Sequence, residues 1–280
     1  MPMPDLPVSA LSISSIRTLR QCPERWRRRY IEREYEPPTG SMQLGKAAGA
    51  AETQSDHHWI AKGEPLDTDQ VLDAFSDEWE IAKGEDVDWR GEKPDALKDA
   101  GASVLRAYHE TVIPSSAAPV EAEREMRIDV EHPDGSAVEF VAYPDAELAD
   151  GNVIDRKVTK QRWSPQKADA DKQADAYLAV RRVEGDPASG FAFDTLVRTK
   201  TPYAERVPTT RTDEELDRFL AEILGAADEI AWRTETDTWS FAPDGAWWCS
   251  ESACGYWSSC PAGGLLRRRA AQAVRNGGGD

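Results

Sequence analysis

The chain has 280 residues, of which 40% are hydrophobic, and a formal net charge of −17. These totals are typical of a globular protein, and they argue against a disordered chain or one that coats nucleic acid through a basic surface. Because no stretch approaches the roughly 18 apolar residues of a membrane helix and the N-terminus lacks the pattern of a secretory signal, we expect a cytoplasmic protein with no membrane partner.

The first third of the chain predicts helices. Residues 11–35 open with a Ser-rich cap and are interrupted at Cys22-Pro23, which predicts a helix, a break and a second helix. After a breaker at residues 36–40, the segment LGKAAGAAETQ predicts a small-residue helix that can pack closely against a sheet. Residues 66–113 carry helical periodicity around a charged loop, and we interpret them as a helical insertion.

The middle of the chain changes to a period of two. Residues 120–132, 136–148 and 152–160 predict three strands, separated by turn signals, and therefore an antiparallel meander. Residues 164–185 then predict one helix, with Ser164 as its N-cap.

The last third predicts a strand, a helix and a tail. Residues 190–200 predict the strand, residues 212–233 an amphipathic helix, and residues 263–280 a flexible tail. Basic residues gather in residues 17–33 and 157–167. Such runs are usually solvated helix faces, although they also fit a local DNA contact.

Two carboxylates and a lysine carry the chemistry. Asp145 lies in one predicted strand and Asp155 in the next, so a hairpin can bring them together. Alternation along the strand sends Asp155 and Lys157 to the same face. Such a group is costly to bury unless a metal or a salt-bridge network compensates it, and oxygen ligands suit Mg²⁺ or Mn²⁺. A bare Asp-x-Lys is more often an exposed strand, but Gln173 and Tyr177 follow on one helical face.

These motifs together resemble a known family. Pro144-Asp145, a nine-residue gap and Asp155-Arg156-Lys157, followed by Gln173-x-x-x-Tyr177, resemble the core of the RecB-like branch of the PD-(D/E)xK nuclease superfamily. The segments LSISSIRTLRQCPERWRRRYIE, LGKAAGAA and WWCSESACGYWSSCP resemble its other blocks, the last being typical of iron–sulfur members such as CRISPR-associated and phage exonucleases. The resemblance implies an α/β fold, restriction-endonuclease-like, with a mixed β-sheet core flanked by helices in a single domain over residues 1–262.

The resemblance also implies roles for matched residues. Asp145, Asp155 and the backbone carbonyl of Arg156 would bind Mg²⁺ or Mn²⁺, Lys157 would position the attacking water, and Gln173 and Tyr177 would hold the site and the DNA strand. The implied function is a metal-dependent deoxyribonuclease, an exonuclease acting on single-stranded DNA or DNA ends. Recombination, repair, replication or CRISPR-adaptation proteins of a bacterium or a phage-infected cell are the implied partners.

One position departs from the family pattern. The family has a histidine metal ligand four residues after its glycine, whereas Gly49 stands at that distance from Gly45 here. His57 and His58 come later and either substitute for it or do not. A second hypothesis therefore stays open, a catalytically silent nuclease fold that binds DNA ends or a recombination partner.

The four cysteines are split between the two ends of the chain. One lies near the N-terminus and three near the C-terminus: Cys22, Cys249, Cys254 and Cys260. Four thiolates can bind a [4Fe–4S] cluster or a tetrahedral zinc ion. The resemblance implies the iron–sulfur cluster, held by Cys22 and the segment 247–261 as a clasp between the chain's ends. A zinc-stapled structural protein is the third hypothesis.

Overall fold

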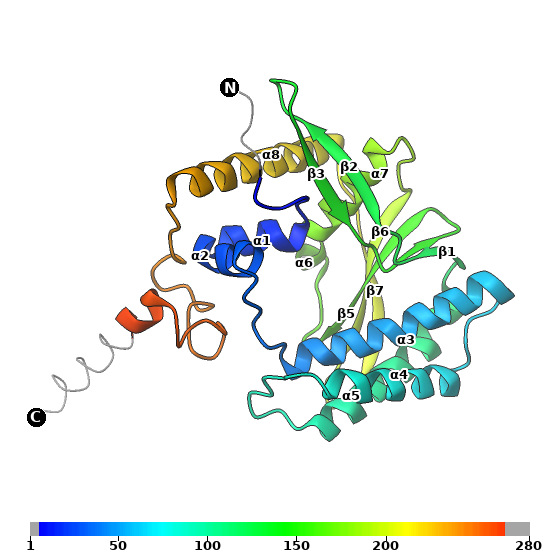
Figure 1. Cartoon of the computed structure of the whole chain (residues 1–280). Helices are drawn as coiled ribbons and strands as arrows, with labels where there is room; N and C mark the ends of the chain where they lie inside the picture. The colour runs from blue at the N-terminus through cyan, green and yellow to red at the C-terminus, as the bar shows by residue number, and fades with distance from the viewer. Residues whose placement is uncertain (1–5, 267–280) are drawn as a thin grey trace, which may run out of the picture. The chain divides into compact units, whose positions relative to one another are not determined.

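The structure is a computed structural model that describes residues 6–266 (Figure 1). It contains two compact units. The core unit comprises Ala10–Ile13 and Pro38–Gly225. The terminal unit joins residues 6–9 and 14–37 to residues 226–266 among those described. Within the described part of the chain, no helix combines the length and apolar character that crossing a bilayer requires.

The core unit is built on a mixed five-stranded sheet. The strands in spatial order are β1 (Pro119–Ala122), β4 (Ala146–Leu148), β5 (Asn152–Thr159), β6 (Gly190–Val197) and β7 (Tyr203–Thr209). β5 and β6 pair in parallel, and the other neighbours are antiparallel. The prediction of an α/β fold with a mixed sheet is therefore confirmed, whereas β7 was missed by the sequence patterns.

The prediction of a three-stranded meander is wrong, because two of the three predicted strands are split. Residues 120–132 break at Glu123, whose φ of 49° ends β1 before β2 (Met126–Glu131) begins. Residues 136–148 break at Pro144, which separates β3 (Ala137–Ala142) from β4. β2 and β3 form a separate hairpin, and the break places Asp145 directly before β4.

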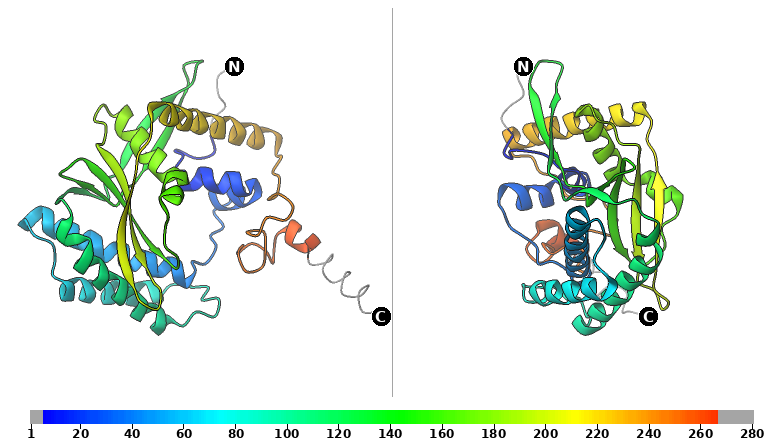
Figure 2. Two further views of the ribbon diagram at one scale, coloured as in Figure 1. Left: turned by 180° about the vertical axis from the view of Figure 1, so that it is seen from behind. Right: turned by 90° about the vertical axis from the view of Figure 1, so that its right-hand side faces the viewer.

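Two helices pack on one face of the sheet, α3 (Gly40–Lys62) and α5 (Pro94–Thr111), and α4 (Thr68–Lys83) packs on both of them. A short 3-10 helix, Ile113–Ser115, follows α5. The predicted helices at residues 44–54 and within 66–113 are confirmed. Their packing is close at Gly101, where a Cβ atom would lie 2.3 Å from the Phe75 ring and 2.6 Å from Leu44. Figure 2 shows these helices running along one another beside the sheet.

The opposite face carries α6 (Pro165–Ala170) and α7 (Lys172–Val183). The prediction of one helix over residues 164–185 is wrong, because Asp171 adopts an extended conformation (ψ 121°) and caps a new helix. α8 (Asp213–Thr236) confirms the predicted amphipathic helix; its residues up to Gly225 belong to the core unit and the rest to the terminal unit.

The terminal unit begins with α1 (Ile13–Gln21), α2 (Pro23–Trp26) and a π-helix (Arg27–Ile31), as the break at Cys22-Pro23 predicts. Trp26 stacks on Trp239 with ring centroids 5.7 Å apart, so the N-terminal helices pack on the segment after α8. Residues 261–266 are helical, and the rest of the predicted tail lies outside the described residues.

Much of the basic run in residues 17–33 is paired inside this unit. Arg25 binds Glu36, Arg27 and Arg28 bind Glu24, and Arg20 binds Glu229. These four arginines therefore have acidic partners within the same unit.

Candidate active site

The β4–β5 hairpin brings the two predicted carboxylates together. Ala146 pairs with Ile154 and Glu147 with Val153, so Asp145 and Asp155 lie at the same end of the pair. The backbone N–H of Arg156 donates to Asp145 Oδ2 at 2.5 Å. Asp145 is thus fixed directly against the strand that carries Asp155.

Asp155 and Lys157 face the same way from β5, as alternation predicts. Lys157 Nζ lies 2.5 Å from Asp155 Oδ2. Asp155 is only 2% exposed, whereas the Lys157 side chain is 28% exposed and reaches solvent. The pair therefore links a buried carboxylate to an accessible ammonium.

α7 supplies the remaining predicted residues. Gln173 Nε2 donates to Asp155 Oδ1 at 3.0 Å. The Tyr177 hydroxyl lies 3.4 Å from the same oxygen and 3.0 Å from the carbonyl oxygen of Tyr143. These contacts orient the carboxylate so that Oδ1 faces α7 and Oδ2 faces Lys157.

Burial and neighbouring charges set the protonation of this group. Burial raises the pKa of Asp155 to about 7, Lys157 opposes that shift, and Asp145 adds to it. Burial disfavours the charge of Lys157, but Asp155 and Asp145 raise its pKa above the ordinary value. Burial also raises the pKa of Tyr177 well above its usual value, so its hydroxyl is a neutral donor. The carboxylates of Asp145 and Asp155 repel each other, and a bound cation would reduce this repulsion.

The donor set fits a hard divalent cation only in part. Within residues 6–266, no three side chains of the His, Cys, Asp and Glu types form a group able to hold a metal ion. Asp145 and Asp155 nevertheless offer carboxylate oxygens side by side. Mg²⁺ and Mn²⁺ accept such oxygens together with backbone carbonyls and water, and Mg²⁺ commonly keeps several waters.

A buried charge network supports β5 from the other face, and the sequence analysis missed it. Arg156 points away from Asp155 and makes a two-bond ion pair with Asp56 of α3, at 2.7 and 3.0 Å. The Tyr108 hydroxyl accepts from Arg156 Nε at 3.3 Å and donates to Asp194 Oδ2 at 2.6 Å. Asp56 lies two residues beyond the helix predicted over residues 44–54, so no local pattern pointed to this pair.

A cavity of about 440 Å³ opens beside Lys157 and is lined partly by α3. Gly45 and Gly49 belong to its wall, and a Cβ atom at either would meet no atom within 4 Å. The position at which the resemblance implies a histidine therefore faces open space. His57 and His58 lie further along α3, exposed and half-buried respectively, outside the cavity wall.

The four cysteines gather in the terminal unit around one small cavity of about 20 Å³. All four are free thiols. Burial raises the pKa of Cys22 and of Cys249, and the nearby thiol of Cys260 adds to both shifts. Tyr256 and Trp257 line the same cavity, whereas Trp247 is 76% exposed.

Hydrogen bonds hold this cysteine segment against the N-terminal helices. Trp248 Nε1 donates to the carbonyl of Gln21 at 3.1 Å, and Arg28 donates to Ser259 Oγ at 2.8 Å. The Gly255 N–H donates to Glu36 Oε1 at 2.5 Å. The two ends of the chain are therefore joined by polar contacts independent of any bound ion.

Comparisons with known proteins give a family and similarities to solved structures. The family model of the PD-(D/E)XK nuclease superfamily matches residues 10–261. A crystal structure named "Putative exonuclease" from Eubacterium rectale aligns with a TM-score of 0.56 and 13% identity, covering 83% of this chain and 84% of that chain. The structure of SSO0001 aligns over 82% of this chain and 88% of that chain at 13% identity, but with a TM-score of 0.33. None of the curated proteins matches.

Proposed function

Because this chain belongs to the PD-(D/E)XK nuclease superfamily, we propose that it is a Mg²⁺- or Mn²⁺-dependent deoxyribonuclease with Asp145, Asp155 and Lys157 at its active centre. The observation that best supports this proposal is the convergence of two carboxylates and one ammonium at the β4–β5 hairpin. An incidental Asp-x-Lys on an exposed strand would leave its carboxylate in solvent, whereas Asp155 is buried.

Each residue has a distinct task in this proposal. Asp145, Asp155 and the Arg156 carbonyl would hold the cation, which when bound offsets phosphate charge and lowers the pKa of a water. Lys157 keeps its proton and reaches solvent, so it can orient the attacking water and stabilise charge on the scissile phosphate. Gln173 and Tyr177 fix the Asp155 carboxylate through Oδ1.

A nuclease assay with matched variants tests the proposal. Wild type, Asp155→Asn and Lys157→Ala would be incubated with labelled DNA in Mg²⁺, Mn²⁺ or EDTA. Asp73→Asn and Lys98→Ala, both in the helical layer away from the hairpin, serve as controls for the same chemical changes. We expect metal-dependent cleavage by the wild type and controls, and a loss of at least about 100-fold in the two site variants. Cleavage by Lys157→Ala at the wild-type rate would refute the assignment.

The exonuclease mode is a finer part of the proposal. It is supported by the resemblance to the RecB-like branch and by the name of the Eubacterium rectale protein, whose fold is similar. DNA labelled at the 5′ or the 3′ end, single- or double-stranded, separates the modes. Release of labelled mononucleotides from one end supports an exonuclease, whereas internal fragments from circular DNA contradict it. Recombination or CRISPR-adaptation partners remain a prediction.

Gly49 favours a second candidate, a silent nuclease fold that binds DNA ends. A Cβ atom at Gly49 would meet no atom within 4 Å, so the position of the family histidine carries no ligand side chain of its own. Tight binding of DNA ends without cleavage in either metal would support this candidate. Cleavage abolished by Asp155→Asn would eliminate it.

We further propose that the four cysteines bind a [4Fe–4S] cluster. Their gathering around one cavity supports this, although the sulfurs must move closer together to ligate a cluster. Anaerobic purification, iron and sulfide analysis, and absorbance near about 400 nm provide the test. A wild type with about four irons per chain, and a Cys254→Ser variant that has lost them, would support the cluster. One zinc ion per chain would support the structural-zinc hypothesis instead.

A further inference from the structure

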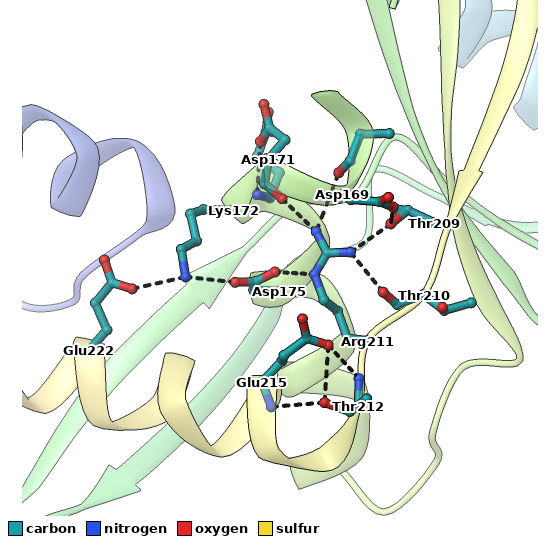
Figure 3. A network of polar contacts seen from close by, with 12 residues as sticks. Asp169, Asp171, Lys172, Asp175, Thr209, Thr210, Arg211, Thr212, Glu215 and Glu222 are labelled. Atoms are coloured by element: carbon teal, nitrogen blue, oxygen red, sulfur yellow. Dashed lines mark hydrogen bonds and ion pairs between the residues drawn. The ribbon is translucent and has the colours of Figure 1, made fainter. Parts of the chain in front are cut away.

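Arg211 lies in the connection between β7 and α8, and every one of its donors is used. Its side chain is 3% exposed. Nε donates to the Asp175 carboxylate, and Nη1 donates to Thr209 Oγ1 at 2.6 Å and to the Thr210 carbonyl at 2.8 Å. Nη2 donates to the carbonyls of Ala168 and Asp171 at 3.4 and 3.0 Å (Figure 3). A guanidinium has five N–H groups, so this one is saturated.

These contacts fix the break between α6 and α7. Ala168 lies in the last turn of α6, and Asp171 is the N-cap of α7, with its Oδ1 accepting from the Gln173 N–H at 3.0 Å. Asp175 lies in the first turn of α7. Arg211 therefore binds the end of one helix and the beginning of the next, and it connects both to the end of β7.

The point at which α7 begins decides where Gln173 points. Gln173 lies in this first turn, between Asp171 and Asp175, so the contacts of Arg211 with these two residues also fix the direction of its side chain. In this structure the start at Lys172 directs Gln173 Nε2 onto Asp155 Oδ1 at 3.0 Å. The alternative, one continuous helix, is what the local sequence favours.

We propose that Arg211 is a positioning residue of the active centre, which sets the start of α7 and thereby holds Gln173 on Asp155. The proposal rests on the proposed function of Asp155. Arg211 binds neither Asp155 nor Lys157 in this structure, so its effect passes through the first turn of α7. A purely structural role would stabilise the fold without changing the geometry at Asp155.

The decisive experiment is a double-mutant cycle between Arg211→Met and Gln173→Ala. In folded protein we expect Arg211→Met to lower kcat by about 10- to 100-fold, with KM for DNA changed by less than about threefold. If Arg211 acts through Gln173, the double variant has the kcat of Gln173→Ala within about twofold. If the two losses multiply, or Arg211→Met keeps the wild-type kcat, the proposal is overturned.

A second variant and a control show whether a loss of kcat comes from misfolding of Arg211→Met. Arg211→Lys keeps the charge beside Asp175, but its three donors at one nitrogen cannot replace the five contacts of the guanidinium, so the same cycle applies to it. Arg182→Met removes ion pairs with Asp213 and Asp217 at the other end of α7, and we expect it to keep kcat.

Amide hydrogen exchange of residues 172–177 gives a readout that does not need activity. We expect faster exchange there in the Arg211 variants than in Arg182→Met, and equal exchange would overturn the proposal. A wild type without nuclease activity would overturn the proposed function, and the exchange comparison would then still decide whether Arg211 sets the start of α7.

Discussion

The buried ion pair between Asp56 and Arg156 gives the sharpest test of how the catalytic strand is supported. The Asp56 side chain is 3% exposed and that of Arg156 is 7% exposed. Asp56→Asn keeps the size of the side chain but removes its charge. The guanidinium would then stay buried behind Asp155 and Lys157 without its two-bond partner.

The expected loss of stability follows from this burial. Removing one member of a buried pair costs about 3–5 kcal/mol, because the remaining charge has lost its compensation but cannot reach water. A domain of this size changes Tm by about 2–4 °C for each kcal/mol. We therefore expect the Tm of Asp56→Asn to fall by about 6–20 °C.

Thermal unfolding followed by circular dichroism measures the effect, and a second variant separates its causes. Asp56→Asn combined with Arg156→Met removes both charges, and it should recover at least half of the lost Tm. Glu80→Gln, on an exposed ion pair of α4, controls for a carboxylate replaced by an amide and should change little. A double variant no more stable than Asp56→Asn would refute the reasoning from charge burial.

Three further outcomes are expected. Gly49→His should tighten Mn²⁺ binding measured by calorimetry, because the imidazole has open space beside Lys157; unchanged affinity would mean that this helix face does not adjoin the metal. Gly101→Ala should lower the free energy of unfolding in urea by about 1–3 kcal/mol, since its methyl overlaps the Phe75 ring, and an unchanged midpoint would contradict that packing. Tyr177→Phe should lower kcat by up to about tenfold with a normal Tm, and a large loss of Tm instead would assign the hydroxyl a structural role.

The sequence was sufficient wherever the relevant contacts are local. The hairpin that joins Asp145 to Asp155, the common face of Asp155 and Lys157, and the four-residue spacing of Gln173 and Tyr177 all follow from strand and helix periods. These are the residues that the structure brings together.

The sequence was insufficient wherever distant residues override local preference. The run from Ser164 to Gly185 favours one helix, and the break at Asp171 is bound by Arg211, which lies 40 residues further along the chain. β7 was missed because its seven residues, YAERVPT, include a charged pair and a proline, which fit an edge strand. The partner of Arg156 lies 100 residues away, so no local pattern could assign it.

The make-up of the terminal unit has a consequence for the order of folding during synthesis. The core unit is encoded almost entirely by one continuous stretch, Pro38–Gly225, so it can fold as soon as that stretch has left the ribosome. The N-terminal helices emerge earlier, yet Trp26 and Cys22 must wait for Trp239 and the last three cysteines. A nascent chain therefore carries an assembled β4–β5 hairpin, with Asp145 beside Asp155, before its N-terminal helices have found their partner. A chain terminated before Trp239 would keep this hairpin but lack the packing of Trp26 on Trp239.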